Sequence, residues 1–115
     1  MSYDIYLEKD GVLVNVPRFC EGGTYPVGGS LEAHISITYN YSTHFYKHLD
    51  PNNGIRWLYG KTGAATQAKL ADAITILGTK QDTDYWAPTP GNAGYALFVL
   101  LAWARLHPHA VWRGD

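Results

Sequence analysis

Two histidines lie four residues apart in the middle of the chain, at a spacing that could serve a metal ion. His44 and His48 would share one face of a helix, and two imidazoles placed in this way could hold one edge of a zinc site. Zinc normally needs three or four ligands, and no His-Glu-x-x-His pattern or acidic cluster completes the pair. A small metal-dependent hydrolase is therefore kept as an alternative, while the expectation is that the protein holds no metal and no cofactor.

The segment Gly60-Lys61-Thr62-Gly63 precedes a predicted helix and ends like a phosphate-binding loop. The full nucleotide-binding pattern requires a glycine five residues before Gly60, where the chain has Ile55. A nucleotide hydrolase is therefore disfavoured. A weaker hypothesis stays open beside that of an ordinary capped helix: free backbone N–H groups at the helix start, together with Lys61 and Thr62, could bind an anion.

Aromatic side chains with polar tips, and amide side chains near them, are dense in this chain. Nine tyrosines and four tryptophans offer rings that can stack on a planar ligand and polar groups that need partners when buried. One interpretation is a second core under the loops, in which Asn40 and Asn92 satisfy backbone groups. The other is a pocket or an interface, although strand alternation places Thr38 and Asn40 opposite Tyr41, so one surface cannot hold the whole set. The predicted binding residues are Thr38, Asn40, Tyr41, His44, Trp57, Lys61, Thr62, Tyr85, Trp86 and Asn92.

No other catalytic machinery is recognisable. The sequence has no Ser-His-Asp arrangement, nucleophile elbow or obvious carboxylate pair, and Asp82 and Asp84 are interpreted as solvating a polar loop. Cys20 is the only cysteine, which excludes an intrachain disulfide and a multi-cysteine zinc site. A non-catalytic protein is therefore favoured over an enzyme.

Length and composition predict a single domain over residues 1–115. Hydrophobic residues make up 46% and charged residues 17% of the chain, which gives enough apolar surface for a core. The net charge of −1 provides no field for duplex nucleic acid or an anionic membrane. The apolar run 95–104 is too short to span a bilayer, and the first ten residues do not form a signal peptide, so we expect a cytoplasmic protein.

The first third of the chain predicts a small antiparallel sheet. Alternating residues at 3–7 and 12–16 flank Asp10-Gly11, a pair that favours a tight hairpin turn. Residues 22–30 carry two Gly-Gly-hydroxyl units around a proline and predict a looped connection. A third strand is predicted over residues 33–40, with one apolar face and one polar face that is either wet or part of a pocket or interface.

The rest of the chain predicts helices that cover one face of this sheet. Ser42 could cap a short helix, residues 63–77 carry an apolar stripe that ends at Gly78, and Thr89-Pro90 predicts a helix start near residue 90. This last helix is apolar on all sides and is expected at the centre, while residues 110–112 fold back on the body. The fold class is α+β, with a small antiparallel sheet packed on one face by two to three helices.

Five short segments carry a resemblance to other proteins; they span residues 38–42, 60–63, 84–86, 89–92 and 108–112. With them, the chain from about residue 22 onward resembles a group of short bacterial and phage proteins that carry no established activity. The resemblance implies an accessory protein of a microbe or of its virus, and it transfers no functional residue.

The leading hypothesis is a non-catalytic cytoplasmic binding protein, expected to be a homo-oligomer, that captures a small polar or nucleotide-like ligand. In a phage setting, such a ligand could be a signalling nucleotide of the host. An alternative is a protein-interaction module that binds a host or virion protein through its aromatic residues. The metal-dependent hydrolase built on His44 and His48 is the second alternative.

Overall fold

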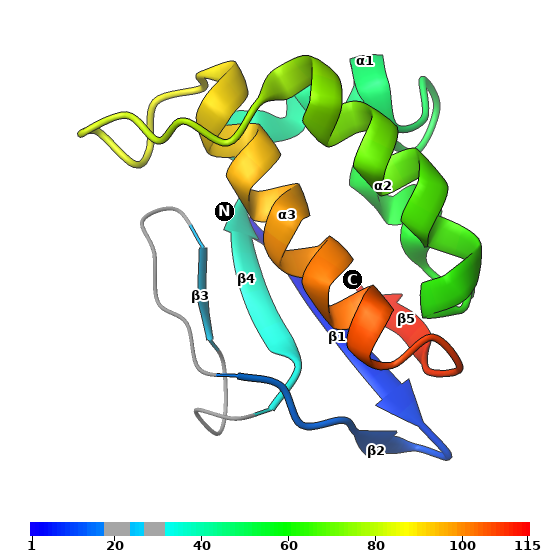
Figure 1. Ribbon diagram of the computed structural model, residues 1–115. Coiled ribbons are helices and arrows are strands. Elements are labelled where there is room, and N and C mark those ends of the chain that lie inside the picture. Colours follow the sequence, from blue (N-terminus) through cyan, green and yellow to red (C-terminus); the bar gives the residue numbers. More distant parts are fainter. Residues whose placement is uncertain (18–23, 27–31) are drawn as a thin grey trace.

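The computed structural model describes residues 1–17, 24–26 and 32–115 (Figure 1). It has the predicted α+β fold. The strands are β1 (Ser2–Lys9), β2 (Val12–Leu13), β3 (Thr24–Pro26), β4 (His34–Thr38) and β5 (Val111–Gly114). The helices are η1 (Tyr39–Tyr41), α1 (Ser42–His48), η2 (Gly54–Leu58), α2 (Gly63–Leu77) and α3 (Pro90–Leu106), where η marks a 3-10 helix.

The sheet is antiparallel and is organised around β1, which pairs with β2, β4 and β5. The predicted N-terminal hairpin is confirmed. Asp10 and Gly11 have φ angles of 55° and 78°, and two successive positive φ values are what a two-residue hairpin turn requires. The second strand is shorter than predicted, since its regular pairing with β1 ends at Leu13, and Asn15 forms an isolated bridge with Glu32 instead.

The inner face of the sheet holds alternate apolar residues, as the pattern predicts. Ile5 of β1 and Ile35 of β4 are both fully buried. The polar face of β4 is buried as well, since Ser36 and Thr38 are only 1% and 4% exposed. The Ser36 hydroxyl donates a hydrogen bond to the Ser2 hydroxyl over 2.7 Å, so part of this face is satisfied within the sheet.

Helices α2 and α3 lie side by side and cover one face of the sheet (Figure 1). Both begin where the sequence predicts: Thr62 and Thr89 accept hydrogen bonds from the backbone N–H groups of Ala65 and Asn92. Gly78 ends α2 with a φ of 75°, a conformation that glycine adopts without strain.

The start of α1 corrects one prediction. Ser42 does not cap this helix; its hydroxyl donates to the carbonyl of Tyr39 over 2.5 Å. The cap lies four residues earlier, where the Thr38 hydroxyl accepts from the N–H of Asn40 at the start of η1. The strand predicted over residues 33–40 therefore ends at Thr38, because the chain turns out of β4 through a 3-10 helix before α1 begins.

Two strands form where the sequence predicted none. Residues 111–114 form β5 against β1, where residues 110–112 were expected only to fold back, and Thr24–Pro26 forms β3 inside the predicted loop 22–30. The rest of that loop, like Cys20, lies outside the described residues.

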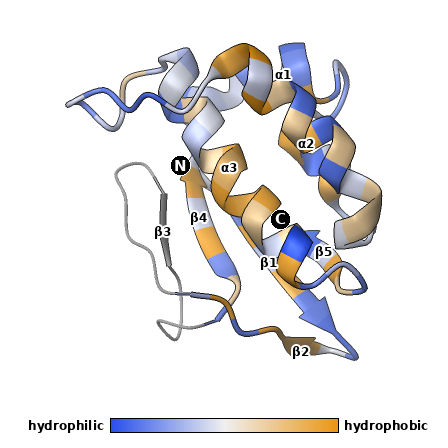
Figure 2. Ribbon diagram, viewed as in Figure 1, coloured by the Kyte–Doolittle hydropathy of each residue, from blue (hydrophilic) through white to orange (hydrophobic). Residues whose placement is uncertain are grey.

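Helix α3 lies over the sheet but is not covered on all sides, because Phe98 and Leu106 are 47% and 54% exposed. Figure 2 shows the apolar character of this helix. Within the described residues, no helix combines the length and hydropathy needed to cross a membrane.

Candidate functional site

The connection between α2 and α3, residues 79–89, is fastened from outside by side chains of η1 and α1; we name it the latched loop. Asn40 donates from Nδ2 to the carbonyl of Trp86, and His44 donates from Nε2 to the carbonyl of Pro88, both over 2.9 Å. The Tyr41 hydroxyl donates to the carbonyl of Tyr85. Three side chains from one turn of the chain therefore hold three backbone carbonyls of the loop.

A second fastening comes from the first turn of α3. Asn92 is only 4% exposed, and its Nδ2 group donates to the carbonyls of Asp84 and Ala87 over 3.1 and 3.0 Å. Its Oδ1 atom accepts from the N–H of Asp82 over 2.9 Å. Because every hydrogen-bonding atom of this buried amide has a partner in the loop, Asn92 fixes the loop's shape.

Two carboxylates shape the tip of the loop. Asp82 accepts from the N–H of Asp84 over 2.8 Å, and Asp84 accepts from the N–H of Trp86 over 3.1 Å. Each is a side chain bonding the backbone two residues on, the arrangement typical of Asx turns. The interpretation that these aspartates merely solvate a loop is therefore incomplete, since they also order it.

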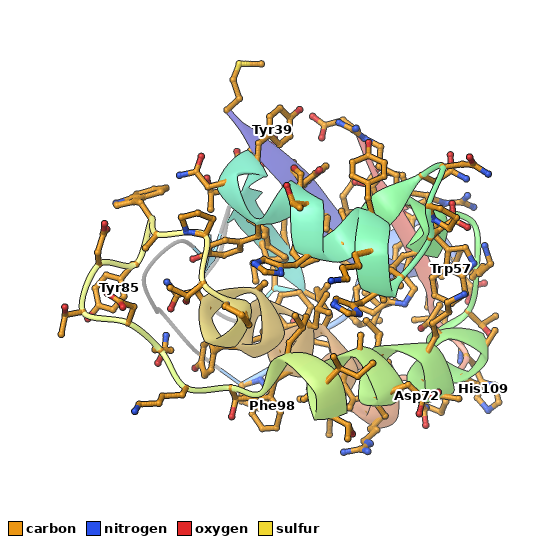
Figure 3. All side chains as sticks on the ribbon, turned by 90° about the horizontal axis from the view of Figure 1, so that it is seen from above. Tyr39, Trp57, Asp72, Tyr85, Phe98 and His109 are labelled. Carbon is orange, nitrogen blue, oxygen red and sulfur yellow. The ribbon has the colours of Figure 1, made fainter. Side chains whose placement is uncertain are left out.

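Two aromatic rings at the loop tip face solvent. Tyr85 and Trp86 are 45% and 54% exposed. Figure 3 shows Tyr85 on the loop at one side of the molecule and Trp57 near the opposite side. The loop thus has a fixed backbone and free rings.

The Tyr41 phenol stays protonated at neutral pH. Burial raises its pKa above the usual range, and the negative charge of Asp84 raises it further. A protonated hydroxyl is what the bond to the Tyr85 carbonyl requires, so the fastening persists across the physiological range.

The start of α2 does not provide the predicted anion site. Its N–H groups are not free: those of Gly63 and Ala64 donate to the carbonyls of Ala110 and Pro108 over 2.8 and 2.9 Å. Lys61 is also engaged, since its Nζ atom donates to the carbonyl of Trp57 over 2.6 Å. The protein's own C-terminal segment occupies the place that an anion would take, so this premise of the sequence interpretation is wrong.

Trp57 is half-buried, and two ammonium groups lie over its ring. The Nζ atoms of Lys61 and Lys69 are 4.6 and 5.2 Å from the ring centroid, within the range of cation–π attraction. The ring therefore already has partners within the chain.

The two histidines have different surroundings and do not complete a metal site. His44 is bonded to the latched loop, and no group of three potential ligands occurs within the described parts of the chain. Partial burial lowers the pKa of His48, and the charges of Lys47 and His44 lower it further.

The structure therefore divides the predicted residues into two sets. The set at the latched loop is Asn40, Tyr41, His44, Tyr85, Trp86 and Asn92, and Thr38 belongs with it only as the cap of η1. The set at the start of α2 is Trp57, Lys61 and Thr62.

Sequence reasoning missed how closely α3 approaches the loop. A Cβ atom on Gly91 would lie 1.8 Å from the carbonyl oxygen of Lys80, so only glycine fits there. The glycine after Thr89-Pro90 was the signal that could have indicated this contact.

Comparison of the chain with protein-family models, curated proteins and solved structures finds no match. The geometry of the latched loop therefore carries the functional argument alone.

Proposed function

We propose that the protein is a non-catalytic binding module that presents Tyr85 and Trp86 to a pocket on a partner protein. The observation that carries this proposal is the contrast within the latched loop. Its backbone is held by Asn40, Tyr41, His44 and Asn92, while both rings remain about half exposed.

Rings on an ordered loop suit protein recognition for two physical reasons. Tryptophan and tyrosine dominate the binding energy of many interfaces, because each buries a large apolar area and carries one polar tip. A loop that is already ordered loses little conformational entropy on binding, so more of that energy becomes affinity. The same rings on a mobile loop would bind more weakly.

A small polar or nucleotide-like ligand is less well supported. Such a ligand needs free hydrogen-bonding groups beside the stacking rings. The amide of Asn92 and the hydroxyl of Tyr41 already bond to the loop backbone, and so does the Nδ2 group of Asn40. What the loop offers to a partner is two exposed rings beside the charged side chains of Lys80, Asp82 and Asp84, and aromatic anchors with a polar rim are typical of protein interfaces. The resemblance to bacterial and phage proteins suggests a host or virion protein as that partner.

The test is affinity capture with matched variants. Immobilised wild-type protein, the double variant Tyr85→Ala/Trp86→Ala and the control Ile76→Ala are exposed to the same host lysate, and bound proteins are quantified by mass spectrometry. Ile76 is a suitable control because it is apolar and 67% exposed but lies on α2. We expect a partner that wild type and control retain and the double variant loses, with all three showing the same circular dichroism.

Two results would contradict the proposal. In the first, every bound protein is retained equally by the double variant, which would show that the rings are not anchors. In the second, calorimetry of the wild type with cyclic and linear nucleotides gives binding heat that Tyr85→Ala/Trp86→Ala abolishes. That result would show that the rings bind a small nucleotide-like ligand instead of a protein.

A further inference from the structure

Helices α2 and α3 share an apolar outer face that none of the described parts of the chain covers. From α3, Phe98 and Leu106 are about half exposed, and Ala102 between them is exposed too. From α2, Ala64, Ala68 and Thr75 are exposed, and Ala71 is half-buried. We name these residues of the two helices the outer face: Ala64, Ala68, Ala71, Thr75, Phe98, Ala102 and Leu106.

Contacts between the helices fix which residues lie level with each other. The helices run antiparallel: Gly94 of α3 approaches Leu77 at the end of α2, and Gln67 near its start donates to the carbonyl of Ala104 over 3.1 Å. Between these two points, Phe98 lies level with the turn of α2 that carries Ala71 and Thr75. Leu106 lies level with the turn that carries Ala64 and Ala68.

Helical geometry places these residues on the same side of the pair. Successive residues of a helix are rotated by about 100° around its axis. Viewed down the axis of α2, Ala71 lies about 40° and Ala64 about 60° from Gln67, the residue that points toward α3. Ile76 lies about 180° from Gln67, on the far side of α2, and Lys69 lies over the Trp57 ring on that same flank. Figure 3 shows Phe98 at the same edge of the molecule as α2.

The face is complementary to a second copy of itself. Its α2 half carries small side chains, and its α3 half carries the large ones, Phe98 and Leu106. A two-fold axis parallel to the helices would lay α3 of each copy on α2 of the other. Phe98 would then pack on Ala71 and Thr75 of the second copy, and Leu106 on Ala64 and Ala68.

We propose that the protein forms a homodimer through this outer face. The four helices would make a bundle in which every pair of neighbours is antiparallel, a common and stable arrangement. Large residues on one helix would enter the space above alanines on the facing helix, which allows the helices to approach closely.

The size and charge of the face agree with a weak dimer. At 1.5 Å per residue, α2 and α3 are about 22 and 25 Å long, and their axes are about 10 Å apart. This face is at the small end for specific interfaces. Two charged residues flank the face: Arg105, in the last turn of α3, where a long side chain can reach water past the end of the bundle, and the exposed Asp72 of α2 (Figure 3), which lies about 40° around the helix axis beyond Ala68, at the rim.

Sedimentation equilibrium over a concentration series tests the dimer. We expect the wild type to pass from monomer to dimer as concentration rises. Ala68→Glu places a charge in the centre of the face and should weaken association at least about tenfold. The matched control Ile76→Glu adds the same charge to an exposed site on the far side of α2 and should leave association unchanged. A wild type that stays monomeric up to about 1 mM, or equal weakening by both variants, would overturn the proposal.

Disulfide trapping tests the arrangement. In a background with Cys20→Ser, one variant carries Ala102→Cys and another Ala68→Cys, which the proposed axis places opposite each other across the interface. Oxidation of the mixture should give mainly the mixed 102–68 disulfide. Predominant 102–102 linkage would indicate α3 packed on α3 and would reject this axis. Neither experiment depends on the partner of the latched loop. The dimer proposal can therefore be rejected while the proposed function stands, and the proposed function can be rejected while the dimer stands.

Discussion

The two ends of α2 use the same kinds of residue in opposite ways. At the end of α2, side chains of η1, α1 and α3 hold the backbone of the latched loop, and the rings of Tyr85 and Trp86 face solvent. At its start, the backbone bonds to strand β5, and the ring of Trp112 is fully buried. The Trp112 indole N–H also has a partner, the Thr66 hydroxyl at 2.9 Å.

This comparison shows that aromatic density alone does not identify a binding surface. What distinguishes the two ends is which groups the protein itself satisfies. Where polar side chains hold the backbone, the rings stay exposed and can contact a partner. Where the backbone fastens itself by strand pairing, the rings fill the core. A ring on the first kind of segment is a candidate anchor, and a ring on the second is a structural element.

The largest effect is expected at the covered end. Trp112→Ala removes the largest fully buried side chain and leaves a cavity between β5 and α2. Substitutions of this kind typically lower the free energy of unfolding by about 3–5 kcal/mol. Urea denaturation followed by far-ultraviolet circular dichroism measures the change without relying on tryptophan fluorescence.

Trp112→Phe serves as the gentler companion variant. It keeps most of the ring volume and removes the hydrogen bond to Thr66, so its free energy of unfolding should lie between those of the wild type and Trp112→Ala. A loss below about 1 kcal/mol for Trp112→Ala would mean that the ring is not part of the core and that the two ends of α2 do not differ in this way.

A smaller and more local effect is expected at the latched loop. Tyr41→Phe removes the hydroxyl that holds the carbonyl of Tyr85, and the loss of one such hydrogen bond costs about 1 kcal/mol. Hydrogen exchange should become faster at the amides of residues 84–87 and stay unchanged at β5. Tyr46→Phe, at a tyrosine that is 38% exposed, is the control. Equal acceleration at both ends would show that Tyr41 stabilises the whole fold rather than the loop.

The sequence predicted the helices well because their boundaries are local. Thr62 and Gly78 bound α2, and Thr89 starts α3, each through a cap or a glycine that acts within a few residues. Strand β5 could not be predicted in this way. It has four residues, and it exists because Trp112 lies opposite Leu7 of β1, a partner more than a hundred residues away.

The residues of the candidate site were predicted, while the sequence left two interpretations of their roles. Asn40 and Asn92 bond to carbonyls of the loop, as the interpretation of a second core under the loops expected, and Tyr41, predicted only as a ligand contact, bonds to a loop carbonyl too. A carbonyl acceptor has no residue type, so no pattern in the sequence could show which carbonyls these side chains bind. The anion site predicted at Lys61 is wrong for the same reason, because the N–H groups at the start of α2 donate to the carbonyls of Pro108 and Ala110.

The exposed rings of the latched loop should contribute least to the free energy of unfolding. Tyr85→Ala and Trp86→Ala, singly or together, should change the free energy of unfolding by no more than about 0.5 kcal/mol, because rings that face solvent contribute little to folding. The backbone of the loop should keep its hydrogen-exchange protection, since its fastening comes from Asn40, Tyr41 and Asn92. A loss above about 1.5 kcal/mol would place these rings in a second core under the loop, and they would then be structural elements like Trp112. Denaturation of the double variant therefore decides whether the rings are available to a partner before any partner is sought.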